Sequence, residues 1–217
     1  MSESRTISLP AAGPERPLAA GGRGAGLVAV LAFAGIVVSR MQSLLIPLIP
    51  QLPGLLHASA TDSTWAVTAT LLAGAVVTPT VGRLGDMVGK RRMLLLSIGM
   101  LIAGSAIGGL STSLVPLVVG RVLQGLAAGV IPLGISIMRD ELAPAKLGGA
   151  TAMMSASLGV GGALGLPAAA VIADNFDWHL LFWIAAALGA VAFVLVVSLV
   201  PESKMRTGGR FDLPGAL

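Results

Sequence analysis

The densest group of charged residues in the middle of the chain lies between two long apolar stretches, from Gly82 to Leu94. This segment holds four cations, one acid and three glycines. Cations in a short loop determine which side of a membrane the loop occupies, and glycines let neighbouring helices approach closely. The acid, Asp86, can pair with an arginine or with a helix N-terminus. We therefore expect a loop that joins two membrane helices.

The composition is that of a membrane protein. Apolar residues make up 55% of the 217 residues and charged residues only 11%, whereas globular domains carry about 25% charged residues. The excess positive charge lies in short connections between apolar runs, and a nucleic-acid-binding protein would show a continuous basic face. We therefore expect a lipid bilayer as a partner and no nucleic acid. The absence of cysteine excludes disulfide frameworks and thiolate metal sites.

Six apolar segments are long enough to cross a bilayer, which takes about 20 residues in a helix. Their expected limits are Ala25–Leu48, Thr64–Val81, Met93–Leu110, Leu114–Met138, Gly149–Ala173 and Leu180–Val200. A soluble core of buried helices is the alternative, and six consecutive spans of this length argue against it. The sequence thus predicts an all-α membrane protein with a disordered cytoplasmic tail (1–23), a six-helix bundle (24–200) and a cytoplasmic linker (201–217).

The distribution of cations predicts the orientation. Twelve of the 14 Lys and Arg residues lie in the tails and in alternate connections, and none lies in the opposite connections near His57, Ser111 and Asp177. Because cytoplasmic loops carry the excess of Lys and Arg, we expect a multi-pass protein of the cell membrane with both termini in the cytoplasm.

Two arginines fall inside the expected spans. Arg121 stands in span four with Gln124 three residues later, and a charge at this depth is costly unless it faces a cavity or a partner. Arg40 lies in span one, about 15 Å from Pro50 at helical rise, and Gln42 has a depth similar to that of Arg121. We expect a polar layer of Arg40, Gln42 and Arg121, with two alternatives: Arg121 as a clamp on backbone carbonyls of span one, and Arg40 near the interface.

Small residues predict where the spans cross. Glycine pairs spaced four residues apart allow close approach of two helices, and such pairs occur in spans three, four and five, at Gly104 and Gly108, Gly125 and Gly129, and Gly161 and Gly165. Span five is the most glycine-rich, because Gly159, Gly162 and Pro167 flank its pair. We expect tight packing there.

Enzymatic interpretations lack the necessary residues. The spacing from Gly85 to Gly89, Lys90 and Arg91 is one residue too short for a phosphate-binding loop, and no Ser or Thr follows the lysine. The two histidines, His57 and His179, lie in expected outer connections, so an intramembrane Ser–His pair or zinc site has no basis. We expect no catalytic residues, no metal and no cofactor.

Several of these patterns resemble motifs of major facilitator superfamily transporters. The loop between helices two and three of that family is matched by Gly82, Leu84, Asp86, Gly89, Lys90 and Arg91. A helix-four motif that the family uses in proton-coupled transport is similar to Arg121, Gln124, Gly125 and Gly129. The motif of the antiporter branch resembles Gly161, Gly162, Gly165 and Pro167, although here Leu166 separates Gly165 from Pro167. The segment 209–217 resembles the linker before span seven of 14-span drug:proton antiporters.

The resemblance implies the N-terminal half of the major facilitator fold, six helices in two inverted three-helix repeats. The implied function is proton-coupled efflux of drugs or other small molecules by alternating access, with Asp86 and its neighbouring cations as a gating latch. A missing C-terminal half, or a second copy of the chain, would complete the transporter. Two alternatives stay open: an uptake facilitator for an anionic or neutral metabolite, which an acid-free core containing arginine suits, and a non-transporting six-helix membrane subunit.

Overall fold

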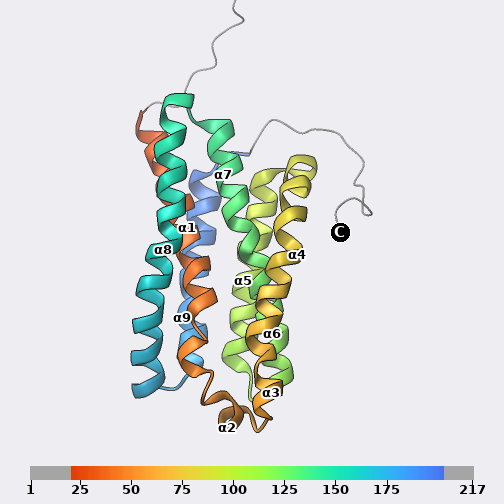
Figure 1. Cartoon of the computed structure of the whole chain (residues 1–217). Coiled ribbons are helices and arrows are strands. Elements are labelled where there is room, and N and C mark those ends of the chain that lie inside the picture. The colour runs from red at the N-terminus through yellow and green to blue at the C-terminus, as the bar shows by residue number, and fades with distance from the viewer. Residues whose placement is uncertain (1–20, 203–217) are drawn as a thin grey trace, which may run out of the picture.

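A computed structural model describes residues 21–202, which form a bundle of long helices (Figure 1). Six helical segments in this range are long and apolar enough to cross a membrane. They comprise α1 (Gly21–Ser43), α4 (Trp65–Val88), α5 (Lys90–Leu110), the pair α6 (Leu114–Leu126) and α7 (Val130–Glu141), α8 (Pro144–Asn175) and α9 (His179–Leu199). Successive spans alternate in direction, so spans one to three and spans four to six form two three-helix units of opposite orientation. The expected fold class is confirmed.

The connections follow from local sequence. After α1, three prolines within seven residues, Pro47, Pro50 and Pro53, prevent a continuous helix. The chain instead forms a 3-10 turn (Ile46–Leu48) and the short helices α2 (Leu52–Leu56) and α3 (Ala60–Ser63). Span four contains a 3-10 turn at Ala127–Gly129 between α6 and α7. Pro132, three residues after this turn, has no N–H to donate to the carbonyl of Ala128, which accounts for the local tightening.

Several helices extend beyond the limits that we expected from the sequence. Helix α4 continues to Val88 and α5 begins at Lys90, so the charged segment 82–94 is not a loop, as we expected, but two helix ends joined at Gly89. Gly89 has φ +118°, a conformation that favours glycine, and this single residue makes the turn. Helix α8 begins at Pro144, five residues before the expected start of span five. Helix α1 begins at Gly21, so residues 21–23 of the expected tail are helical, while residues 1–20 and 203–217 lie outside the described range.

The helices pack in two groups. Helix α1 packs against α8 and α9, while α4, α5 and α6 pack against one another, and the groups meet chiefly through α5 and α9. Glycines make the closest crossings. A Cβ at Gly120 would lie 2.7 Å from the carbonyl oxygen of Gly104, and a Cβ at Gly161 would lie 2.7 Å from that of Ile36. Close approach of this kind gives the van der Waals contact that holds membrane helices together.

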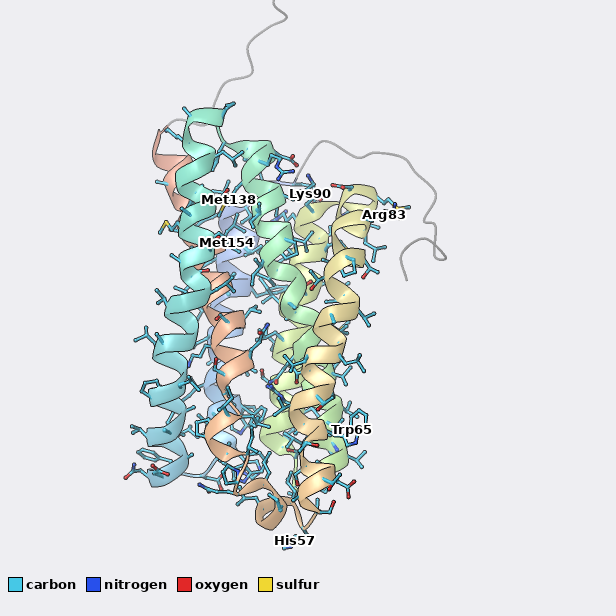
Figure 2. All side chains as sticks on the ribbon, viewed as in Figure 1. His57, Trp65, Arg83, Lys90, Met138 and Met154 are labelled. Carbon is cyan, nitrogen blue, oxygen red and sulfur yellow. The ribbon has the colours of Figure 1, made fainter. Side chains whose placement is uncertain are left out.

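The two ends of the bundle differ in charge. Lys90 and Arg83 lie at one end and His57 at the other, with Trp65 closer to the end that carries His57 (Figure 2). Trp65 is exposed, as expected for an aromatic anchor in the membrane interface. The cation-rich end is the one that we predict to be cytoplasmic.

Cysteine labelling will test this orientation, because the chain has no native cysteine. Arg139 and His57 are both exposed. Arg139 lies in the last turn of α7, next to the partner of Lys90, and His57 lies at the opposite end of the bundle from Lys90 (Figure 2). We expect a membrane-impermeant maleimide to label His57→Cys in intact cells and to label Arg139→Cys only after permeabilisation. The reverse pattern would overturn the predicted topology.

Candidate functional site

The most deeply buried charged side chain of the described residues is Arg121, on α6, which is 1% exposed. Its Nε donates a hydrogen bond to the backbone carbonyl of Ala66 in α4 (3.1 Å). Its Nη1 donates to the carbonyl of Met41 in α1 (3.2 Å) and to Oε1 of Gln124 (2.7 Å). Nε2 of Gln124 in turn donates to Oγ of Ser105 in α5 (3.0 Å). One arginine and one glutamine thus connect four helices inside the bundle.

Close helix crossings hold this network in place. Gly120 and Gly125 flank Arg121 and Gln124 on the buried face of α6. Gly120 meets the backbone of α5 at Gly104, and a Cβ at Gly125 would clash with the carbonyl oxygen of Thr70 in α4. Because α6 lies so close to α4, the side chain of Arg121 bonds the α4 backbone at Ala66 and still extends far enough to reach the α1 backbone at Met41.

The expected polar layer forms only in part. The structure brings Arg121 and Gln124 together. On α1, Arg121 contacts the backbone carbonyl of Met41 and not the side chains of Arg40 and Gln42. Gln42 is exposed, and Arg40 is partly buried with its side chain against Gly165 of α8. Residues 40 and 42 are two positions apart and point to different faces of α1, so they cannot both face Arg121. The contact to Met41 is the clamp on span one that we considered as an alternative.

The charged cluster lies where α4, α5 and α7 end together. Nζ of Lys90 lies 2.7 Å from Oδ2 of Asp140 on α7 and 3.4 Å from Oδ1 of Asp86 on α4. The side chains of Lys90 and Asp140 are about nine-tenths buried, whereas that of Asp86 is half exposed. Lys90 is therefore held by Asp140, and Asp86 keeps one face available for another partner.

The other residues of the predicted motif surround this cluster. Gly85 packs against Leu133 of α7, while Gly82 has open space beside it and Leu84 is half-buried. Arg91 donates to the carbonyl of Val197 in α9 (2.6 Å). The segment thus connects α4 and α5 to the end of α9.

The glycines of α8 lie along α1. Gly161 packs against Ile36 and Ser39, and Gly165 packs against Arg40. Oγ of Ser39 donates to the carbonyl of Leu158 (2.6 Å), which adds a hydrogen bond to this crossing. Gly162 is half-buried next to Ser43, and Pro167 is exposed. The pattern that we singled out in span five is therefore the contact surface for span one.

Sequence reasoning missed Asp140 and Ser105. Asp140 stands at the end of span four. Spans two and four end on the same side of the membrane, so the sequence did indicate that Asp140 lies on the same side as Asp86 and Lys90. For Ser105 no signal distinguishes it from other small residues of α5.

At the other end of the bundle, His179 lies between the carboxylate of Asp177 and the carbonyl of Ser111. A hydrogen bond from the backbone N–H of His179, and a second one with its ring, hold the pKa of Asp177 below its ordinary value. This contact fastens the start of α9 to the end of α5.

Acidic side chains are placed only at the ends of the described spans. Asp62, Asp86, Asp140, Glu141 and Asp174 all lie in or next to terminal turns. Within residues 21–202, no group of three or more His, Cys, Asp or Glu side chains could hold a metal ion.

Six membrane helices that cross on glycines around a buried, hydrogen-bonded arginine define a polytopic membrane protein. Residues 31–213 match the model of the Major Facilitator Superfamily. The chain belongs to this family of transporters.

Similar proteins include several named for drug resistance. The chain is 34% identical over 169 residues to "Probable multidrug resistance protein EmrY" of Escherichia coli, covering 77% of this chain and 33% of the relative. It is 31% identical over 201 residues to the tetracenomycin C resistance and export protein of Streptomyces glaucescens, covering 91% of this chain and 37% of the relative. The chain spans between 25% and 44% of the length of the curated relatives that it matches.

The fold also matches solved structures. The crystal structure of the POT family transporter PepTSo superposes with a TM-score of 0.72 at 19% identity, covering 87% of this chain and 40% of that one. The likeness shows the major facilitator fold, because the identity is too low for more.

Proposed function

We propose that this chain forms one six-helix half of a secondary transporter that exports drug-like small molecules by alternating access, coupled to protons. The observation that carries the export proposal is the similarity of most of the chain to proteins named for multidrug resistance and for tetracenomycin C export. Transporters of this architecture bind substrate near the bilayer midplane, between two repeats or halves that rock against each other.

The described geometry supports a half that moves as one body. Arg121 and Gln124 join α1, α4, α5 and α6 through hydrogen bonds in an environment with little competing water. Lys90 joins α5 to α7 at one end through Asp140. A rigid half can transmit a change at one end of the bundle to the other.

The gating proposal concerns Asp86. Its side chain is half exposed at the end of α4, and its ion pair to Lys90 is the longer of the two that Lys90 makes. Asp86 can therefore contact a second half in one state and release it in the other. Because the described spans carry no acid away from their ends, the residue that binds the coupling proton would come from the second half.

We expect Asp86→Asn to reduce transport at least tenfold while insertion and expression stay near the wild-type level. A solvent-accessible ion pair contributes only about 0–1 kcal/mol to stability, so losing it leaves the fold intact and removes the proposed latch. The matched control is Arg139→Gln, which removes an exposed charge outside the segment 82–94 that forms no ion pair among the described residues. Initial transport rates and membrane expression levels will be compared, and wild-type transport by Asp86→Asn would refute the latch.

Uptake of an anionic or neutral metabolite is the second candidate. The absence of acids from the middle of the described spans, together with the partly exposed Arg40, favours an anionic or neutral substrate over a cationic one. A non-transporting subunit is a further alternative from a different class.

Reconstitution will distinguish these functions. The chain alone and the chain joined to a second six-helix half will be placed in proteoliposomes with an imposed proton gradient. Two probes will be compared: ethidium, which is a cation, and a fluorescent organic anion. Export predicts saturable, gradient-driven ethidium flux in the joined protein and none in the chain alone. Anion flux without ethidium flux would favour the second candidate, and flux by neither would favour the subunit.

A further inference from the structure

An apolar groove of about 510 Å³ lies between the first turns of α1 and α8, next to Leu142. Both helices begin at this end of the bundle, as Figure 1 shows. The hollow exists because Gly24 and Gly149, which line it, have no side chains, and a Cβ at Gly149 would meet no atom within 4 Å. The groove is therefore open space that the described residues leave unfilled.

The lining is apolar along its length. Val28 of α1 faces Ala150 and Met153 of α8, and Met153 is 50% exposed. Residues 145, 149, 150 and 153 follow helical spacing, so they present one continuous face of α8. A surface of this kind next to a membrane interface accepts hydrocarbon.

The rim of the groove is positively charged. Lys146 lines the groove and is exposed, and it forms no ion pair with the described residues. Neither α1 nor α8 has an acidic side chain in its first turn. Of the two acids at the neighbouring end of α7, Asp140 is bound to Lys90, and Glu141 forms no ion pair with Lys146. The cation of Lys146 therefore has an apolar groove beneath it and no ion-pair partner among residues 21–202.

We propose that this groove binds an anionic glycerophospholipid. The headgroup phosphate contacts the ammonium of Lys146, and the upper part of one acyl chain lies between Val28 and Met153. Basic residues between membrane helices at an interface are a recurring means of recognising acidic headgroups. A free phosphate would leave the apolar lining exposed, whereas a phospholipid satisfies the charge and the lining together.

Lipid binding will be measured by native mass spectrometry of the purified chain in detergent, with phosphatidylglycerol or phosphatidylcholine added. We expect one retained phosphatidylglycerol. Lys146→Gln should lower its retention about fivefold, the factor for one lysine at an anionic surface. Gly149→Leu should abolish retention by filling the groove. The controls are Arg139→Gln, an exposed cation outside the groove, and Gly148→Leu, a neighbouring exposed glycine that does not line it; both should bind like wild type.

Three outcomes would overturn the proposal: equal retention of both lipids, equal retention by the variants and their controls, or binding of phosphatidylglycerol that appears only after residues 1–20 are removed. Soluble glycerol 3-phosphate should not compete, and full displacement by it would show an anion site without an acyl chain. The same variants will be crosslinked in membranes with a photoactivatable phosphatidylglycerol. Peptides from the first turns of α8 should carry the label in wild type and in Gly148→Leu but not in Gly149→Leu, and label on all three would also refute the site.

Discussion

Replacing Arg121 with alanine is expected to abolish transport and to lower the thermal stability of the bundle by about 2–4 kcal/mol. The substitution removes three hydrogen bonds from a fully buried guanidinium. It leaves Oε1 of Gln124 without a donor and opens a cavity between α1, α4 and α6. A hydrogen bond to a charged group contributes about 1.5–3 kcal/mol, and a buried polar atom that loses its partner pays its desolvation cost. The desolvation cost of the buried guanidinium itself offsets part of the sum over the three bonds.

Two further variants test whether the effect is specific to the arginine at position 121 or would follow from any positive charge in the membrane. Arg121→Lys keeps the charge, but an ammonium cannot reproduce the planar fork that reaches two helix backbones and Gln124, so we expect it to recover expression better than transport. Arg40→Ala should cost less than Arg121→Ala in both measurements, because Arg40 is partly exposed and packs along Gly165. Thermal unfolding in detergent and transport in vesicles provide the readouts. An Arg121→Ala protein with wild-type transport would show that this network only packs the helices.

The second large effect is expected at Gly120. A Cβ there would lie 2.7 Å from the carbonyl oxygen of Gly104 and 3.1 Å from the backbone nitrogen of Gly108. Both contacts are to backbone, which cannot move aside as a flexible side chain can. Gly120→Leu should therefore separate α5 from α6 and lower the free energy of unfolding by about 1–3 kcal/mol, the usual cost of overpacking.

The matched control for this crossing is Gly99→Ala on α5. A Cβ at Gly99 meets nothing within 4 Å, and alanine is about 1 kcal/mol better than glycine within a helix, so this variant should be as stable as wild type or more stable. Because the crossing also positions Gln124 against Ser105, the Gly120 variant should lose transport together with stability. A folded, active Gly120→Leu protein would mean that the crossing is looser than the structure shows.

Much of the fold could be predicted because its determinants are local. A bilayer requires each spanning segment to satisfy its own backbone hydrogen bonds and to present apolar side chains, so composition within about 20 residues identifies a span without knowledge of its neighbours. The buried position of Arg121 follows in the same way, since a charge within an apolar run must face the protein interior. Glycines spaced by four residues likewise indicate a crossing, although they do not identify the helix that is crossed.

The tertiary structure alone decided the partners. Lys90 pairs with Asp140, 50 positions away, and Arg121 meets the carbonyls of Met41 and Ala66. Backbone carbonyls are the same in every residue, so no sequence pattern marks the two that Arg121 contacts. The expected polar layer of Arg40, Gln42 and Arg121 forms only in part, because depth along a helix does not determine the direction in which each side chain points. Sequence determined which residues enter the membrane, and helix packing determined which of them touch, because hydropathy is a local property whereas rotation and neighbour choice depend on the whole bundle.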